Sequence, residues 1–225
     1  MRDFKYVFLL TYARSGSTLL QSLLNSEPTA QIRGENNNAL FHLFKTIEAV
    51  TQSKTQHGQR VTEPDTPWYG AETLTPVGFK TNALNLFVNG VLKPDPGMKI
   101  IGFKEIRHIP FFMGNQDFEN YCKFLLNSFP NAKIIFNSRE ADDVSKSAWL
   151  SELNPDVVKR GVRAADERFK RAAATFENAM HVQYEDYVAD HSKLREMFKF
   201  LGYEYDKARV DAIFSKRLTH AKQSV

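Results

Sequence analysis

The sequence predicts an α/β fold in three layers, in which a central parallel β-sheet is flanked by helices, within a single domain of residues 1–225. The main observation is an alternation. Short runs rich in β-branched and aromatic residues alternate with runs whose apolar residues recur at helical spacing. Strands that alternate with helices pair in parallel, and such a sheet is covered on both faces. The chain also contains no internal repeat and no low-complexity linker, so we expect one domain.

The first half of the chain begins with a strand, a turn and a helix. Residues 5–13 are apolar and largely β-branched or aromatic, and after the turn the leucines between Leu19 and Leu24 recur at helical spacing. The further elements we expect are an extended segment at 30–33, a helix from Asn38 to Ser53, a surface loop at 54–76, a helix at 81–92 and a strand at 99–106.

The second half continues the alternation of strands and helices. We expect strands at 132–137 and 181–184 and helices at 118–128, from Asp143 to Trp149, at 155–180, at 192–201 and at 206–216. Asp143 is a good N-cap residue for the second of these helices.

Composition and charge narrow the class of partner. The net charge of +4 favours an anionic ligand, but lysine and arginine are spread along the chain, which disfavours a nucleic-acid partner. Cys122 is the single cysteine, which excludes an internal disulfide and a cysteine-rich metal site and fits a reducing, cytoplasmic location. The short apolar run at 6–13 follows Asp3, so we interpret it as a strand rather than a signal peptide. No run approaches the roughly 20 apolar residues that cross a bilayer.

A turn of small and hydroxyl-bearing residues joins the first strand to the first helix. Backbone N–H groups at the start of a helix can converge on a phosphate, and Gly16 permits close approach. The side-chain donors are Arg14, Ser15, Ser17 and Thr18. The alternative is a plain capped turn with Ser15 or Ser17 as N-cap. The first glycine and the lysine of the ATP-binding pattern G-x-x-x-x-G-K-[S/T] are absent, which disfavours an ATPase.

Arg14-Ser-Gly-Ser-Thr-Leu-Leu20 resembles the 5′-phosphosulfate loop of sulfotransferases that use 3′-phosphoadenosine-5′-phosphosulfate (PAPS). The resemblance is closest to the bacterial carbohydrate and tyrosylprotein enzymes, since the cytosolic steroid and phenol enzymes carry lysine where Arg14 stands. It implies a P-loop-like fold, PAPS as donor and 3′-phosphoadenosine 5′-phosphate (PAP) as product. It also implies that residues 14–18 bind the 5′ end of the donor. No metal is expected, because side chains can supply the positive charge.

A second segment, residues 137–149, resembles the 3′-phosphate pattern of the same family, Arg-x-x-x-Asp-Val-x-x-Ser. Arg139 ends a strand, and Ser147 follows it by eight positions, so a helix that starts near Asp143 can present Ser147 on a consistent side. The resemblance implies that Arg139 and Ser147 bind the 3′-phosphate. Glu140-Ala141 departs from the pattern, in which proline is common. The alternatives are a surface arginine paired with a neighbouring acid and a solvent-facing helical serine.

Sulfuryl transfer needs a deprotonated acceptor oxygen and cations beside the charge-bearing oxygens. Arg14 is our candidate for the leaving oxygen, and Lys104, which matches a family lysine near the donor sulfate, is the second cation. Glu35 is our candidate general base, because the resembling enzymes carry a glutamate at about this distance after the loop. Those enzymes often have paired acids where this chain has Glu35-Asn36, so the resemblance leaves the position that matches the family's base open by one residue.

His108 is the rival base. His108-Ile-Pro resembles the His-Leu-Pro of the cytosolic sulfotransferases, whose histidine is the base. There the lysine stands two places before the histidine, whereas here Lys104 stands four places before it. On an extended chain this insertion displaces the imidazole from the position that it has in those enzymes.

These patterns together predict an O-sulfotransferase whose acceptor is a small molecule or carbohydrate with a free hydroxyl. Acceptor specificity is expected from the 54–76 loop, where Trp68-Tyr69 either stacks on the acceptor or attaches the loop to the core. Two other functions stay open: a P-loop nucleotide kinase or other phosphotransferase, which needs ATP and Mg²⁺, and a non-catalytic nucleotide-binding module. Lys216, Arg217 and His220 are candidate cations for the 3′-phosphate.

Overall fold

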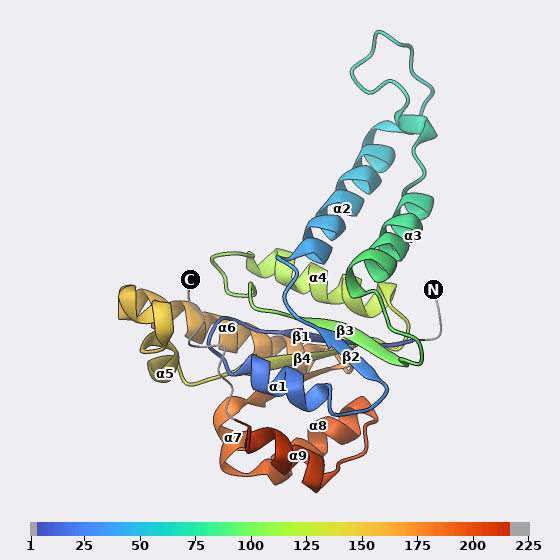
Figure 1. Cartoon of the computed structure of the whole chain (residues 1–225). Coiled ribbons are helices and arrows are strands. Elements are labelled where there is room, and N and C mark those ends of the chain that lie inside the picture. The colour runs from blue at the N-terminus through green and yellow to red at the C-terminus, as the bar shows by residue number, and fades with distance from the viewer. Residues whose placement is uncertain (1–3, 217–225) are drawn as a thin grey trace. The chain divides into compact units, whose positions relative to one another are not determined.

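The computed structural model describes residues 4–216, except the side chains of residues 148 and 149 (Figure 1). The chain divides into two compact units. Asn38–Pro94 forms the smaller one, and Arg2–Asn37 together with Asp95–Val225 forms the larger one. Among the described residues, every one predicted to bind the donor or to take part in catalysis belongs to the larger unit. The assignment of residues 1–225 to a single domain stays a prediction.

Parallel strands form the sheet of the larger unit. They are β1 (Lys5–Leu10), β2 (Ala30–Arg33), β3 (Ile100–Glu105), β4 (Lys133–Ser138) and β5 (Ala179–Gln183). Their order is β2-β3-β1-β4-β5, and each neighbouring pair is parallel, as predicted. From β1 the chain proceeds to one side of the sheet, and from β4 it proceeds to the other. The carboxyl ends of β1 and β4 therefore form the point where the strand order reverses, which is where open α/β sheets bind ligands.

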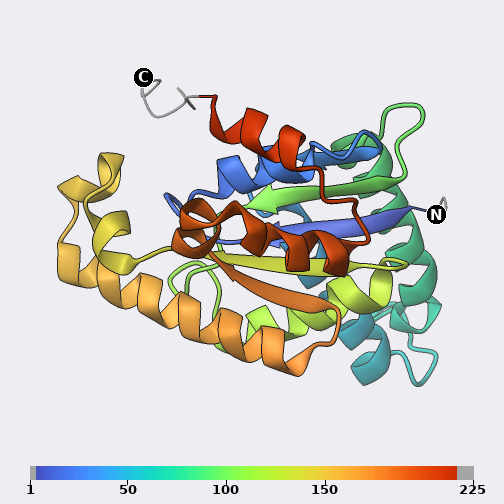
Figure 2. The ribbon, with the colours of Figure 1, turned by 90° about the horizontal axis from the view of Figure 1, so that it is seen from below.

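Helices cover both faces of this sheet, which confirms the predicted three layers. One face carries α4 (Asn115–Ser128) and α6 (Pro155–Thr175), and the other carries α1 (Ser17–Leu24), α8 (Leu194–Leu201) and α9 (Lys207–Phe214) (Figure 2). Short helices α5 (Ala141–Ser145) and α7 (Tyr184–Ala189) follow β4 and β5, and each is followed by a 3-10 turn, η3 (Ala148–Glu152) or η4 (His191–Lys193).

Side chains that alternate along β1 pack into the two helical layers. Val7 and Leu9 belong to one apolar cluster with residues of α1, α8 and α9. Phe8 points the other way, where its ring lies 5.2 Å from that of Phe103. In the same layer Phe136 of β4 stacks on Phe169 of α6 at 5.1 Å. This burial on both faces explains why β1 and β4 contain continuous apolar runs in the sequence.

The smaller unit contains two helices in contact, α2 (Ala39–His57) and α3 (Pro76–Phe87). Between them lies the 3-10 turn η1 (Ala71–Thr73), and a π-helical turn, η2 (Val88–Leu92), follows α3. The helix predicted at 81–92 begins earlier because Pro76 occupies its first turn, where proline is tolerated. The surface loop begins later than predicted because α2 continues to His57, whose ring stacks on Trp68 at 3.8 Å. Within this unit Trp68 therefore attaches the loop to α2.

Two further boundaries differ from the sequence-based expectation. The helix predicted at 155–180 ends at Thr175, and the last strand starts at Ala179. The chain needs the intervening residues to turn back, and the turn is closed by a hydrogen bond from Ala179 N to Phe176 O. No helix within residues 4–216 is long and apolar enough to cross a membrane.

Candidate active site

The turn after β1 has the backbone shape of an anion-binding loop. Arg14 (φ 65°) and Gly16 (φ 80°) both lie in the left-handed region, and Gly16, rather than either neighbouring serine, is the N-cap of α1. A Cβ at Gly16 would lie 2.2 Å from Cδ2 of Tyr184, so backbone and packing both require glycine. The first N–H groups of α1 have no partner within the helix, as in any helix, and can serve an anion at this edge of the sheet.

Buried hydrogen bonds support the loop from the sheet side. The Thr11 hydroxyl lies 2.7 Å from Ser15 Oγ and 2.7 Å from the carbonyl oxygen of Asn137. Since one hydroxyl carries one proton, Ser15 donates to Thr11 and Thr11 donates to Asn137. The Asn137 amide in turn donates to Ser15 O at 2.7 Å and accepts from the Tyr187 hydroxyl at 3.1 Å. The Ser15 hydroxyl is thus used inside the protein, whereas Ser17 and Thr18 open α1.

The two predicted phosphate motifs meet. Nε of Arg14 donates to Oγ of Ser147 at 2.9 Å, and NH1 of Arg139 donates to the carbonyl oxygen of Arg14 at 3.3 Å. The contact joins the end of β1 to the segment after β4, and these are the two strand ends at the reversal point. The structure therefore brings together three side chains that the sequence predicted to bind the donor.

Ser147 does not lie on a helix, contrary to the prediction. α5 has Glu140 as N-cap and ends at Ser145, and Ser147 has an extended backbone (φ −98°, ψ 122°) before η3. The physical reason is a 3-10-type bond from Ser147 N to the carbonyl oxygen of Val144 at 3.0 Å, which ends the helix. Asp143, the predicted N-cap, lies instead in the first turn of α5.

Arg139 is held on several sides. Its guanidinium lies over the ring of Tyr184 at 4.6 Å, and its Nε lies 3.9 Å from Oε1 of Glu185. That Nε is buried and has no hydrogen-bond partner among the described residues. Because an unsatisfied buried donor is costly, this N–H is a candidate donor to an anionic ligand.

A partly buried network that sequence analysis missed fixes the backbone of Arg139. The Tyr12 hydroxyl accepts a hydrogen bond from Arg139 N at 2.8 Å and donates to Oδ1 of Asp166 at 2.8 Å. Ser138 donates to the same Asp166 oxygen at 2.6 Å, and Nε2 of His181 lies 2.8 Å from Ser138 Oγ. Burial raises the pKa of Asp166 and, together with the nearby Asp166 charge, raises the pKa of Tyr12. Tyr12 and Asp166 are 154 residues apart, so no spacing could reveal the pair.

Adjacent residues of β3 hold the predicted base. Nζ of Lys104 lies 2.5 Å from Oε1 of Glu35, with the lysine side chain 6% exposed and the glutamate side chain 39% exposed. The fully buried Glu105 carboxylate accepts from Asn36 N at 3.1 Å and from Ile106 N at 2.9 Å. This pairing follows from the sheet order, since β2 is the neighbour of β3. Lys104 and Glu105 thus fix the Glu35-Asn36 segment at the carboxyl edge.

His108 lies inside the protein. Its ring is fully buried, parallel to that of Tyr121 at 6.3 Å, and its Nδ1 lies 3.2 Å from the carbonyl oxygen of Glu105. A carbonyl only accepts, so Nδ1 carries the proton, and Nε2 has no hydrogen-bond partner among the described residues. Burial lowers the pKa of His108 to about 4.

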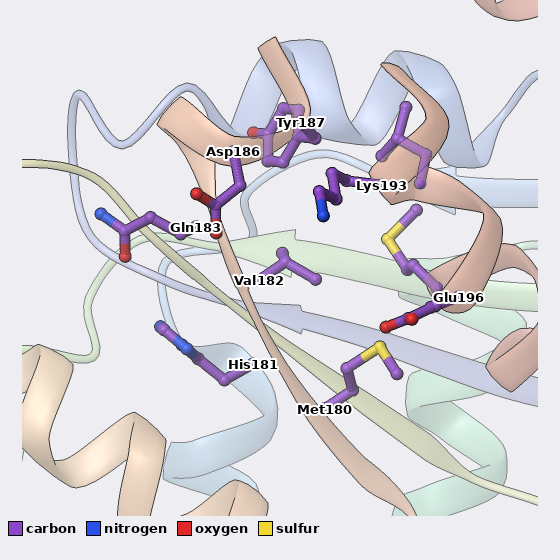
Figure 3. Close-up of a pocket in the computed structure, with 10 residues that line it drawn as sticks. Met180, His181, Val182, Gln183, Asp186, Tyr187, Lys193 and Glu196 are labelled. Atoms are coloured by element: carbon purple, nitrogen blue, oxygen red, sulfur yellow. The ribbon is translucent and has the colours of Figure 1, made fainter. Parts of the chain in front are cut away.

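A separate pocket of about 190 Å³ lies beside the edge strand β5 (Figure 3). It is lined by residues of β5, α7, η4 and α8, including His181, Gln183, Asp186, Lys193 and Glu196. None of the predicted donor-binding or catalytic residues lines this pocket. Of the other predicted cations, Arg217 and His220 lie outside the described residues.

The fold and the site together define the class of protein. It is a parallel α/β protein with a glycine-containing anion loop after β1, and an arginine and a serine after β4 face that loop. Glu35 and Lys104 form an ion pair at the same, carboxyl edge of the sheet.

A family model described as "Sulfotransferase family" matches residues 7–207, so the chain belongs to the sulfotransferase family. Among solved structures, the sulfotransferase domain from the curacin biosynthetic pathway is similar, with a TM-score of 0.51, 17% identity and coverage of 98% of this chain and 83% of that one. This likeness shows the fold. Sulfotransferase STF9 from Mycobacterium avium (TM-score 0.46, 12% identity, 95% and 68% coverage) and mouse sulfotransferase SULT7A1 complexed with PAP (0.45, 15%, 100% and 68%) also match. A comparison with curated proteins gave no match.

Proposed function

We propose that the chain moves a sulfuryl group from PAPS to an acceptor hydroxyl and releases PAP. The observation that carries the proposal is the contact of Arg14 with Ser147 at the reversal point of the sheet, beside Arg139. Two groups of anion donors, one on each strand end, suit a nucleotide that carries phosphate at both its 5′ and 3′ positions. Arginine provides bidentate, charge-assisted hydrogen bonds to such groups.

In this proposal residues 14–18 bind the 5′-phosphosulfate, chiefly through backbone N–H groups and the Arg14 side chain. Arg139 and Ser147 bind the 3′-phosphate. The buried Nε of Arg139 supports this assignment, because a phosphate oxygen would satisfy a donor that has no hydrogen-bond partner among the described residues. Ser15 contributes through its backbone, since its hydroxyl donates to Thr11.

Glu35 is the proposed general base. It takes the acceptor's proton as the acceptor oxygen attacks sulfur, and the bond from sulfur to the bridging oxygen of the 5′-phosphate breaks in line. The electron pair of that bond stays on PAP, where Arg14 stabilises it. Lys104 orients the Glu35 carboxylate and supplies positive charge at the same edge.

The burial of His108 argues against it as the base. A general base is most efficient when its pKa lies near the working pH, and the pKa of His108 is lowered to about 4. Its ring is also fully buried, whereas the Glu35 side chain is 39% exposed and can meet an acceptor. No metal takes part in this proposal, and a cytoplasmic location stays a prediction.

Ligand-dependent melting tests the proposal. At a hundredfold excess over its dissociation constant, PAP should raise the free energy of unfolding by about 2.7 kcal/mol, whereas ATP–Mg²⁺ should not. Transfer from PAPS should then persist with EDTA present. Stabilisation by ATP–Mg²⁺ alone would instead indicate a kinase. Binding of PAP without transfer to any hydroxyl would indicate a non-catalytic nucleotide-binding module.

A further inference from the structure

The turn between β3 and α4 exposes two adjacent phenylalanines. Phe111 is 86% exposed and Phe112 is 52% exposed, and their rings meet edge to face with centroids 5.2 Å apart. Large apolar side chains usually lie inside a protein, and contiguous exposed ones commonly mark a binding surface. We call these two residues the aromatic pair.

A buried arginine fixes the turn that carries the aromatic pair. Arg168 of α6 is 2% exposed and donates to the carbonyl oxygen of His108 at 3.3 Å and to that of Met113 at 2.8 Å, which are the two ends of the turn. It also donates to Oδ1 of Asn115 at 3.0 Å and lies over the ring of Phe118 at 4.8 Å. Burying a cation is costly unless it is hydrogen-bonded. The hydrogen bonds of Arg168 to both ends of the turn fix the shape of the turn.

The turn starts beside the phosphate loop. His108 N donates to the carbonyl oxygen of Thr11 at 3.2 Å, and Thr11 N donates to that of Glu105 at 3.0 Å. Tyr12 and Arg107 form an isolated antiparallel bridge. Residues 105–108 are therefore bonded to the segment that leads into the loop, and Lys104 is the next-to-last residue of β3. The aromatic pair follows within a few residues, at the same edge of the sheet.

The size of the aromatic pair indicates what it binds. Two phenylalanines exposed to this degree offer roughly 200–300 Å² of apolar surface. A standard protein interface needs about 800 Å² from each partner, so the pair alone is too small for a stable protein complex. It matches one ring or one alkyl chain, which stacks or packs on a rigid aromatic face at little entropic cost.

We propose that the aromatic pair binds the acceptor, and that the acceptor is a phenol or an alcohol with an aromatic ring or alkyl chain rather than a bare sugar. This inference rests on the proposed sulfuryl transfer at Glu35. The hydroxyl lies toward Glu35 while the apolar part contacts Phe111 and Phe112. Arg168 acts as a positioning residue for the pair.

The experiment uses the full chain with PAPS and three probe acceptors: 2-naphthol, 1-octanol and glucose. We expect kcat/KM for 2-naphthol and 1-octanol to exceed that for glucose by about tenfold or more, since apolar contact supplies binding. The double variant Phe111→Ala/Phe112→Ala should lose about tenfold for the two apolar probes, mainly through KM, with the PAP-induced melting shift unchanged. The control Phe176→Ala changes the same residue type at the opposite edge, where α6 turns back into β5, and should leave these values unchanged.

Binding of 2-naphthol to the PAP complex, followed by its fluorescence, gives a readout that needs no turnover. Binding that the double variant abolishes supports the proposal. Equal use of glucose, or a double variant with unchanged KM for 2-naphthol, would overturn it while leaving sulfuryl transfer intact. Self-association that the double variant abolishes would also overturn it, since a second copy would then occupy the pair. If PAP did not shift the melting temperature, the proposed sulfuryl transfer itself would be refuted.

Discussion

Arg14 and Ser147 are hydrogen-bonded, Nε to Oγ at 2.9 Å, although 133 residues separate them in the chain. The contact removes the alternative in which Ser147 is a solvent-facing helical residue, because its hydroxyl points to the loop after β1. It also places the phosphate loop and the segment after β4 on one surface before any ligand binds. Preorganised donors need little rearrangement when an anion arrives.

Replacing Glu35 by glutamine tests the base. Glu35→Gln keeps the shape and removes the proton acceptor, so kcat should fall by about a hundredfold or more, the range that general-base catalysis supplies. The PAP-induced melting shift should persist. Glu119→Gln is the control, since Glu119 forms an exposed pair with Lys123 on α4 and should keep full activity. Near-normal turnover by Glu35→Gln would exclude Glu35 as the base.

Replacing Gly16 by alanine tests the shape of the phosphate loop. The new Cβ would meet Tyr184 at 2.2 Å, and φ of 80° is unfavourable for alanine. We expect a loss of about 1–3 kcal/mol in the free energy of unfolding, typical of strain or overpacking, and a weaker PAP complex. Gly161→Ala in α6, where a Cβ meets nothing within 4 Å, should instead stabilise the fold slightly. Urea unfolding with and without PAP measures both, and a Gly16→Ala variant of normal stability and affinity would refute the account of the loop.

Tyr12 should act on the nucleotide through Arg139. Tyr12→Phe removes the acceptor for Arg139 N and the donor to Asp166, and leaving buried partners unsatisfied costs about 1–3 kcal/mol. We further expect weaker binding of PAP but not of AMP, which lacks the 3′-phosphate. Calorimetric titration of both ligands measures this. The control Tyr205→Phe loses only a half-buried bond to His191 O. Equal weakening for PAP and AMP would mean a purely structural role.

His108 should make stability fall in mild acid. Burial, with a further contribution from Arg168, lowers its folded-state pKa from 6.5 to about 4, although Glu105 partly favours the proton. As the pH falls from 6.5 toward 4, the unfolded chain binds a proton that the folded chain refuses. The free energy of unfolding should therefore drop by up to about 1.4 kcal/mol per pH unit over that window. Urea unfolding of wild type and His108→Gln at pH 7 and pH 5 tests this, and an identical pH slope in both would contradict it.

Most of the sheet was predictable because the central strands β1, β3 and β4 are buried on both faces, which leaves a continuous apolar run such as Tyr6–Leu10. The phosphate loop was predictable too, since its residues are contiguous. The helix that should have carried Ser147 was not, because a single bond from Ser147 N to Val144 O ends α5. That choice between an α-helix and a 3-10 turn depends on fractions of a kcal/mol per residue, which local propensities do not resolve.

Partners that are distant in the chain explain what the sequence missed. Two interactions depend on where α6 lies across the sheet. They are the Tyr12–Asp166 pair and the hydrogen bonds of Arg168 to the turn before α4. A lone tyrosine after a strand and lone polar residues in a helix carry no pattern that identifies their partners. The Lys104–Glu35 pair was different, because Lys104 lies near the end of β3, Glu35 follows the neighbouring strand β2, and the sequence indicates each of them separately.

Arg14, on one side, and the pair Arg139 and Ser147, on the other, are proposed to bind opposite ends of one adenosine nucleotide. Titration calorimetry of PAP and AMP against the wild type and Arg139→Ala tests it most directly. We expect the wild type to bind PAP at least about a hundredfold more tightly than AMP, since a charged hydrogen-bonded phosphate contributes several kcal/mol. Arg139→Ala should lose most of that preference while still binding AMP. Equal affinity of the wild type for the two ligands would contradict the claim.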